Sequence, residues 1–151
     1  MALSVGDFAP DFTLPSTSGS TFGLSKEGQG KPCILYFYPK DFTPGCTKEA
    51  CSFRDNIQDF AEYDIDVYGI STDSIPKHQE FKAKYKLPFE LLADVEGKVS
   101  KAYDAKMPFM NVSKRVTYLL DAEHRIVAVY SDMFGAEKHI QKMIKKVKEE
   151  V

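Results

Sequence analysis

Residues 33–54 read CILYFYPKDFTPGCTKEACSFR, and the arrangement of the whole chain follows from this stretch. Its first six residues are a continuous apolar and aromatic run, which is typical of a strand buried on both faces of a sheet. Pro39 ends that strand. Thr43 and Pro44 then favour a helix start, because threonine is a good N-cap residue and proline suits the first helical position. The stretch therefore predicts a buried strand that is followed at once by a helix.

Cys46 falls in the first turn of this helix, at the third helical position if Thr43 is the N-cap. The unpaired N–H groups and the positive end of the helix dipole stabilise a thiolate there. A capping box would carry glutamate or glutamine at this position; here a thiolate takes that place, and we expect it within reach of the Thr43 hydroxyl. The alternative is a small, buried, unreactive cysteine beside a turn. The cap, the preceding strand and a second thiol at Cys51 favour a reactive cysteine.

The spacing of Cys46 and Cys51 carries its own prediction. On an intact α-helix, Cα atoms five residues apart are separated by roughly 8.5 Å. Cysteines whose Cα atoms are more than about 7 Å apart cannot form a disulfide without backbone movement. If these two cysteines do pair, the first turns of the helix must unwind, and Gly45 would ease that opening because glycine lowers helix propensity.

Length and composition narrow the class of protein. At 151 residues we expect one domain, spanning residues 1–151. The content of 43% hydrophobic and 28% charged residues is ordinary for a soluble globular chain, and the net charge of −2 argues against a nucleic-acid partner. No apolar run approaches the ~18 residues that would suggest a membrane span. The first residues lack a basic start and an apolar signal core, so we expect a cytoplasmic location.

Cysteine and histidine usage predicts neither a disulfide framework nor a metal site. The chain has three cysteines, at 33, 46 and 51, with no Cys-x-x-Cys, and its histidines at 78, 124 and 139 are scattered. We therefore expect no metal and no other cofactor. Cys33 lies inside the apolar run and is expected to pack in the strand core. In a reducing compartment, a close pair such as Cys46 and Cys51 is more often catalytic or redox-sensing than structural.

Periodicity along the rest of the chain predicts an α/β fold with a central mixed β-sheet flanked by helices. Residues 1–32 are rich in turn-forming residues and leave room for one short strand. Residues 121–124 read as a hairpin turn. Further strands are expected at 66–71, 89–93, 116–120 and 126–131, and helices at 44–63, 75–85, 97–103 and 136–151.

The motifs around Cys46 resemble those of the peroxiredoxins, and within that family those of the bacterioferritin comigratory protein / peroxiredoxin Q group. The spacing Pro39-x-x-x-Thr43-x-x-Cys46 matches the family's peroxidatic motif, and the longer run from Tyr36 to Asp55 is specific to the group. Further similarity lies at residues 6–15, 68–73 and 115–121, so the resemblance covers nearly the whole chain.

The resemblance implies a thioredoxin-like fold and a thiol peroxidase that reduces hydrogen peroxide and organic hydroperoxides in antioxidant defence and redox homeostasis. Cys46 would be the peroxidatic cysteine and Cys51 the resolving cysteine of an intramolecular disulfide. Pro39, Thr43 and Arg115 would complete the active site. Thioredoxin or a related dithiol would be the reductant. The group is often monomeric, and a weak dimer is the alternative.

Two features depart from the family pattern. The segment between Tyr103 and Arg115 looks shorter than in many relatives and is rich in Met and Phe, which leaves the rim of the site and the preferred peroxide open. Lys114 adjoins Arg115, so the choice of the active-site cation depends on register. Glu49 is a weaker candidate, since a single helix carboxylate is more often a surface charge. Tyr36, Phe37 and Tyr38 are expected in the core.

Two other functions compete with this interpretation. The first is a disulfide oxidoreductase of the thioredoxin type, which the lack of a Cys-x-x-Cys motif weakens. The second is a peroxide sensor or holdase chaperone with little turnover. Steady consumption of peroxide with a reductant separates the first from a peroxidase, and a Cys46→Ser variant that keeps its function would favour the chaperone.

Overall fold

The computed structural model describes residues 3–131 and 136–150, which form a central β-sheet covered by helices. The five strands of the sheet follow the order β5-β4-β3-β6-β7. The first three in the chain are parallel to one another, and the last two form an antiparallel hairpin beside β3. Their bounds are β3 Cys33–Phe37, β4 Asp66–Ser71, β5 Glu90–Ala93, β6 Val116–Leu120 and β7 Ile126–Ser131. The mixed sheet confirms the predicted architecture.

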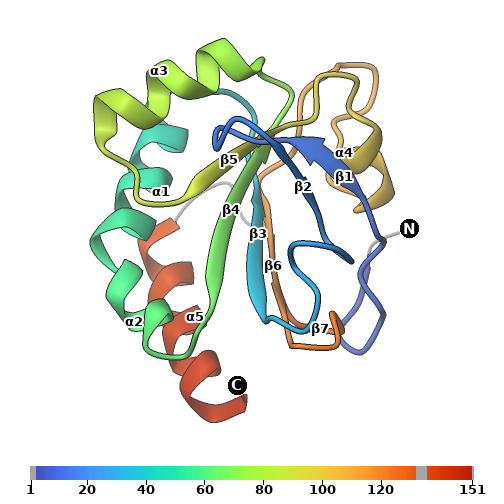
Figure 1. Cartoon of the computed structure of the whole chain (residues 1–151), viewed down its shortest axis with the longest axis vertical. Coiled ribbons are helices and arrows are strands. Elements are labelled where there is room, and N and C mark those ends of the chain that lie inside the picture. The colour runs from blue at the N-terminus through green and yellow to red at the C-terminus, as the bar shows by residue number, and fades with distance from the viewer. Residues whose placement is uncertain (1–2, 132–135, 151) are drawn as a thin grey trace.

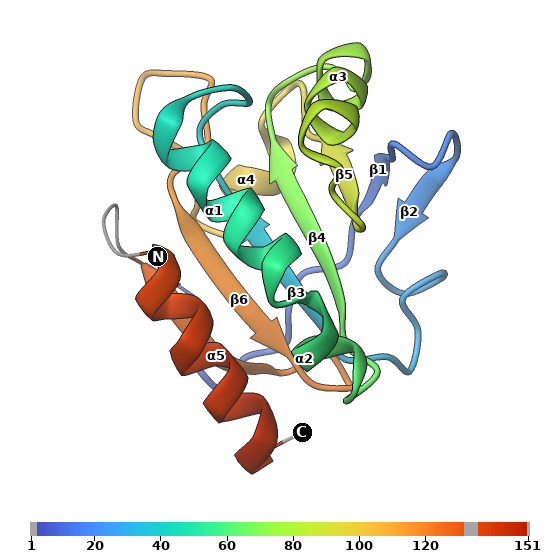
Figure 2. The same ribbon diagram turned by 90° about the vertical axis from the view of Figure 1, so that its left-hand side faces the viewer.

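The helices are divided unequally between the two faces of the sheet (Figures 1 and 2). Four of them pack on one face, whereas α4 and a small antiparallel hairpin lie on the other. The first face carries α1 Pro44–Asp55, α2 Ile57–Ala61, α3 Ile75–Tyr85 and α5 Ala136–Glu150. The second carries β1 Thr13–Pro15, β2 Thr21–Gly23 and α4 Lys98–Ala102. Strand β3 is the middle strand of the sheet, and the segment that carries Cys46 begins at its end.

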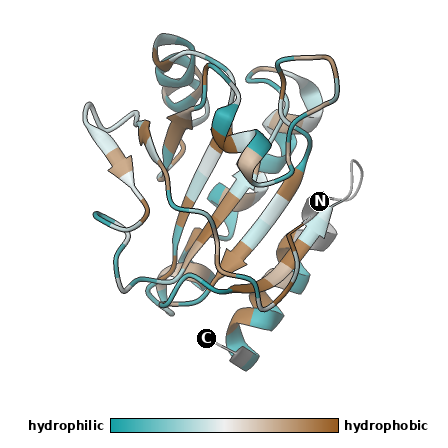
Figure 3. Ribbon diagram, turned by 90° about the vertical axis from the view of Figure 1, so that its right-hand side faces the viewer, coloured by the Kyte–Doolittle hydropathy of each residue, from teal (hydrophilic) through white to brown (hydrophobic). Residues whose placement is uncertain are grey.

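The central strand β3 contributes to both hydrophobic cores because alternate residues point to opposite faces. Ile34 and Tyr36 pack under the four helices, whereas Cys33, Leu35 and Phe37 pack against the hairpin and α4. All five are at most 2% exposed. Figure 3 shows hydrophobic residues along the strands of the sheet. The strand is thus buried on both faces, as its unbroken apolar run predicts.

Two local differences from the sequence prediction have clear causes. The helix expected over 44–63 is divided at Asn56, whose side chain donates to the Ser52 carbonyl and so competes with the helical ladder. The N-terminal region contains two short strands instead of one. Strand β2 has three residues, which is too short for any periodicity to reveal.

The remaining elements agree with the prediction to within a residue or two. Helix α3 has the expected bounds, and the turn at 121–124 joins β6 to β7. Helix α5 buries Ile140, Ile144 and Val147 as its periodicity indicates, while Val151 lies outside the described residues. Among the described helices, none is long and apolar enough to cross a membrane.

Candidate active site

Cys46 lies buried at the start of α1, with 1% of its surface exposed. The intrahelical ladder begins where the Thr47 N–H donates to the Thr43 carbonyl at 2.9 Å. The N–H groups of Gly45 and Cys46 therefore precede the ladder, at the positive end of the helix dipole. This is the environment that the sequence predicted for a reactive thiol.

Arg115 is the cation that contacts this thiol. Its Nη2 donates to Cys46 Sγ at 3.2 Å, across 69 residues of chain. The two residues meet because Arg115 immediately precedes β6, which pairs with β3 in the sheet. A Cβ atom at position 45 would lie 3.1 Å from Nη2, so Gly45 leaves room for the guanidinium. Of the two neighbouring cations Lys114 and Arg115, it is Arg115 that contacts the thiol.

Glu49 belongs to the same cluster, and the preference for a surface charge was wrong. Its Oε1 accepts from Arg115 Nη1 at 2.6 Å, and the residue is 4% exposed. Glu49 follows Cys46 by three positions, which places both side chains on one face of α1. The physical reason for the error is that the residue before β6 brings a partly buried cation to this face, and the spacing within α1 carries no signal of it.

For both Glu49 and Arg115, burial and the neighbouring charges shift the pKa in opposite directions. Burial raises the pKa of Glu49 to about 7, although the Arg115 charge and hydrogen bond oppose the rise. Burial by itself would lower the pKa of Arg115, but the charges of Glu49 and Cys46 outweigh it and raise that pKa. The guanidinium therefore stays charged and uses separate nitrogens to hold the thiol and the carboxyl.

Thr43 is the N-cap residue of α1, but its hydroxyl makes no capping hydrogen bond to the helix. It donates instead to the Lys40 carbonyl at 2.8 Å and closes the turn before the helix. A hydroxyl has a single proton, and here the turn takes it, so the Thr43 hydroxyl does not donate to the sulfur. The Thr43 oxygen keeps its lone pairs and can still accept a hydrogen bond from a ligand.

Pro39 and Arg115 lie at the edge of an apolar groove of about 370 Å³. The segment between Tyr103 and Arg115 forms the far wall, because Lys106 and Ser113 pair as an antiparallel bridge. Near its tip, Phe109 and Met110 are strongly exposed. The groove is lined by Pro39, Met107, Met110, Val112, Ser113, Lys114, Arg115 and Ser131. The Met- and Phe-rich departure noted in the sequence therefore forms the rim of the site.

Cys46, Cys51 and Cys33 are all free thiols in this structure. Cys51 is half-buried and lies five residues after Cys46 on the same unbroken helix. The two thiols thus have the helical separation that was judged too long for a disulfide. Cys33 packs in β3 as expected, and burial together with the charge of Asp66 raises its pKa to about 12.

A second polar cluster, which the sequence analysis did not identify, lies just before α1. Asp41, Asp73 and His78 are buried together and come from three separate segments. Asp73 follows β4 and His78 lies in α3, so only the fold brings them to Asp41. An unusual histidine within a helix that is otherwise rich in lysine is the one hint that the sequence offers.

The fold and the site together define a class of thiol redox proteins, because an arginine holds a helix-start cysteine at the centre of a thioredoxin-like sheet. The AhpC/TSA family model matches residues 5–129. Peroxiredoxin Bcp of Bacillus subtilis is 46% identical over 133 residues, covering 84% of each chain. The crystal structure of peroxidoxin BcpB from Mycobacterium tuberculosis superposes with a TM-score of 0.90 at 34% identity, covering 97% of each chain.

A plant relative matches equally well over part of its length. Peroxiredoxin Q of rice, named as chloroplastic, is 44% identical over 144 residues, which is 95% of this chain and 66% of the rice protein. The present chain therefore spans about two thirds of that relative. It belongs to the AhpC/TSA family and, within it, to the peroxiredoxin Q/Bcp group.

Proposed function

We propose that this chain reduces hydrogen peroxide and organic hydroperoxides with Cys46 as the peroxidatic cysteine and Cys51 as the resolving cysteine. One observation carries the proposal, namely the contact of 3.2 Å between Arg115 Nη2 and Cys46 Sγ at the start of α1. A thiolate is the nucleophile in such chemistry, and here the guanidinium and the N–H groups that precede the helical ladder lie beside the sulfur.

In the first step, the Cys46 thiolate attacks one oxygen of the peroxide and the O–O bond breaks. Sulfur is oxidised by two electrons to a sulfenic acid, and the other oxygen leaves as hydroxide or alkoxide, which takes a proton to give water or alcohol. Arg115 and the N–H of Cys46 are donors that are already in place for the charge that develops on the leaving oxygen.

Thr43 and Pro39 serve this step in different ways. Because the Thr43 hydroxyl donates to Lys40, its oxygen acts as an acceptor and orients the proton of the peroxide. Pro39 lines the groove beside Arg115 and shields the reacting atoms from water. Both residues therefore position the peroxide, whereas Arg115 also stabilises charge.

In the second step, the Cys51 thiol condenses with the sulfenic acid to form a disulfide and release water. The first turns of α1 must unwind for this, because the helical separation of the two cysteines exceeds disulfide reach. An external dithiol, for which thioredoxin is the expected source, then restores both thiols by exchange.

The apolar groove supports organic hydroperoxides as substrates alongside hydrogen peroxide. Met107, Met110 and Val112 offer an apolar wall to an alkyl group while the peroxide end reaches Arg115. A hydrogen peroxide molecule needs only the polar end of the groove. The same site can therefore take both kinds of peroxide.

The setting of this chemistry is part of the proposal. The two hydrophobic cores share one sheet, which supports a single domain over residues 1–151. Three free cysteines fit a reducing compartment, for which we propose the cytoplasm. We propose a monomer as the working form. Sedimentation of the reduced protein and imaging of the tagged chain in its own cells test these two statements.

A Cys51→Ser variant tests the proposed division of labour between the two cysteines. It should react once with peroxide at the wild-type rate, form no disulfide and lose steady turnover with thioredoxin. Cys33→Ala is the matched control and should keep the full cycle. Normal thioredoxin-dependent turnover in Cys51→Ser would remove Cys51 from the mechanism.

A further inference from the structure

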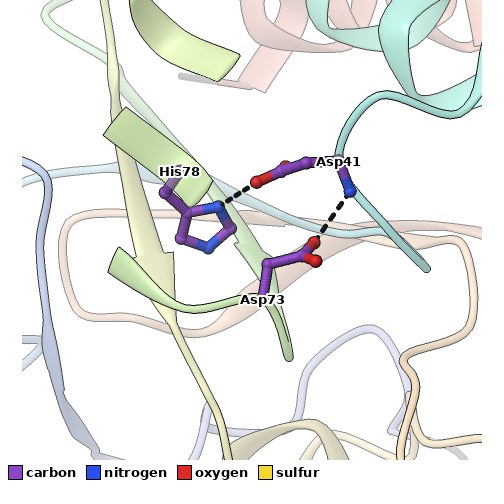
Figure 4. A group of neighbouring side chains, drawn as sticks. All are labelled: Asp41, Asp73 and His78. Carbon is purple, nitrogen blue, oxygen red and sulfur yellow. Dashed lines mark hydrogen bonds and ion pairs between the residues drawn. The ribbon is translucent and has the colours of Figure 1, made fainter. Parts of the chain in front are cut away.

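The turn that joins β3 to α1 is held in place by the buried polar cluster at Asp41 (Figure 4). The Asp41 carboxylate accepts from the Tyr38 hydroxyl at 2.5 Å through Oδ1, and its Oδ2 lies 2.6 Å from His78 Nδ1. The Asp41 N–H donates to Asp73 Oδ2 at 2.7 Å. Both the carboxylate and the imidazole have no exposed surface. Asp41 is therefore fixed through its backbone and its side chain, five residues before Cys46.

The hydrogen bonds fix the proton count of the Asp41–His78 pair. His78 Nε2 lies 3.0 Å from the Leu92 carbonyl, and a carbonyl only accepts, so Nε2 carries a proton. At 2.6 Å a second proton must lie between Nδ1 and the carboxylate. The pair therefore has no net charge, whichever of its two atoms holds that proton. A buried neutral pair avoids the penalty of an isolated buried charge.

The same three residues have ligand types that suit a metal ion, but their atoms are already engaged. Besides its bond from Asp41 N–H, Asp73 Oδ2 accepts from the Ser71 hydroxyl at 2.7 Å. Asp73 Oδ1 lies 3.3 Å from the Lys77 ammonium. A cation at this point would have to displace a lysine and break hydrogen bonds inside the core. The cluster is therefore built to hold the chain and not an ion.

Helix α3 supports the same turn through a second contact. The ring of Phe42 meets Phe81 edge-on, with centroids 5.1 Å apart, and Phe81 is one helical turn beyond His78. Phe42 has a φ of 67°, a left-handed conformation that costs a residue with a side chain roughly 1–2 kcal/mol. Such a conformation persists only where the surroundings over-determine it. The contacts of α3 to Asp41 and Phe42 provide that constraint.

We propose that His78 is a positioning residue for the peroxide reaction, and that it acts through Asp41 to hold the turn that places Pro39, Thr43 and Cys46. The inference rests on the proposed function for the roles of those three residues. His78 itself does not touch the peroxide. It lies in the buried face of α3, and its contribution is to keep the reacting sulfur and the donors in register, since errors of about 1 Å can cost on the order of 100-fold in rate.

Two substitutions at one position separate this role from simple packing. In His78→Asn, the amide nitrogen replaces Nδ1 and can donate to Asp41, while the bond to Leu92 is lost. In His78→Gln, the amide nitrogen replaces Nε2 and can donate to Leu92, while the bond to Asp41 is lost. The two variants differ little in polarity and both leave one bond, so they should lose similar amounts of stability.

The readout is the single-turnover rate of Cys46 oxidation by hydrogen peroxide, measured on the folded protein. We expect His78→Gln to slow it by ~10- to 100-fold, and His78→Asn to stay within about threefold of wild type. Equal rates in the two variants, whether both fast or both slow, would overturn the proposal. Melting temperatures measured in parallel report the packing effect, which should not follow this order.

A second pair of variants keeps the test decisive if His78→Gln does not fold. Asp41→Asn can accept from Tyr38 and donate to a neutral His78, so the cluster stays complete without a carboxylate. Asp41→Ala leaves His78 and Tyr38 without this partner. We expect near-normal oxidation of Cys46 in Asp41→Asn and a loss of at least ~10-fold in Asp41→Ala. The reverse order, or equal losses, would contradict the proposal.

Alkylation of Cys46 by iodoacetamide distinguishes failure of this inference from failure of the proposed function. The rate of this reaction depends on the surroundings of the sulfur and needs no peroxide. If the variants rank as above in alkylation while the wild type does not consume peroxide, the proposed function fails and the positioning role stands. If the wild type consumes peroxide and the variants do not differ in either assay, the positioning role alone fails.

Discussion

Cys33 and Cys46 are nearly equally buried, at 2% and 1% exposed, yet their sulfurs face opposite environments. Cys33 sits in the middle of a strand, where burial and the charge of Asp66 raise its pKa to about 12. Cys46 sits at a helix start, where Arg115 donates to its sulfur at 3.2 Å. Burial alone therefore does not distinguish an inert thiol from a reactive one. The charges and dipoles that face the sulfur do.

The largest expected effect comes from removing the sulfur of Cys46, and removing the sulfur of Cys33 in a separate variant is the comparison. Cys46→Ser should lower peroxide consumption by at least ~1,000-fold, since it removes the nucleophile. Cys33→Ala should leave the rate per folded molecule unchanged and cost about 1 kcal/mol of stability. Coupled assays of peroxide loss with a dithiol reductant measure both. Comparable losses of rate in the two variants would erase the distinction between the two sites.

Removing the cation that distinguishes Cys46 should have the next largest effect. Arg115→Met is expected to slow the oxidation of Cys46 by ~100- to 1,000-fold, because a donor aimed at the leaving oxygen is lost. The fold should survive, since a carboxyl with a pKa of about 7 can take up a proton once its partner is gone. Arg125→Met, directly before β7, is the control. A near-wild-type rate in Arg115→Met would assign the role to another cation.

Glu49 provides a pH-dependent test of the charged environment around Cys46. The folded state raises the pKa of Glu49 from 4.5 to about 7, so it binds the proton more tightly than the unfolded chain does. The resulting stabilisation is fully present below pH 4.5 and is lost as the pH rises through about 7. It amounts to at most on the order of 3 kcal/mol.

Denaturant unfolding of wild type and Glu49→Gln across this pH range measures that linkage. The glutamine cannot titrate, so the wild type should gain stability relative to Glu49→Gln as the solution is acidified from about pH 7 toward 4.5. A stability difference that does not vary with pH would show that Glu49 titrates normally in the folded protein.

The smallest expected effect concerns the apolar groove that is lined in part by Arg115, the residue that contacts Cys46. Met110→Ser at the apolar rim should lower kcat/KM for cumene hydroperoxide by about threefold, below the ~10-fold that a single methylene is worth in a closed pocket. The value for hydrogen peroxide should not change, because this substrate has no alkyl group. Equal losses for both peroxides would exclude the groove as the alkyl site.

The parts of this molecule that depend on local patterns were predictable from the sequence. The apolar run of β3, the threonine and proline that begin α1, and the periodicity of α5 each follow from residues close together in the chain. For the candidate site, Pro39, Thr43, Cys46 and Cys51 could be named from the sequence because they lie in one stretch, residues 36–55, and their roles stay predictions. Arg115 was placed by resemblance, and the fold then brought it to the sulfur.

The parts that depend on tertiary contacts were not predictable in the same way. Glu49 is buried because β6 brings Arg115 to the same face of α1, 66 residues further along the chain. The Thr43 hydroxyl donates to the Lys40 carbonyl, and this hydrogen-bond partner depends on the exact path of the turn. Asp41 and His78 meet only once α3 has packed on the sheet. Pairing between distant segments leaves no periodicity in the sequence, and these residues were accordingly missed or misjudged.

The most direct test is a single-turnover reaction of the reduced protein with hydrogen peroxide, followed by mass spectrometry of the three cysteine-containing peptides. The account predicts fast oxidation that ends in a disulfide between Cys46 and Cys51, with Cys33 still a thiol. Slow oxidation, or oxidation spread over Cys33, would contradict it, because the contact of Arg115 with Cys46 would then confer no special reactivity on that sulfur.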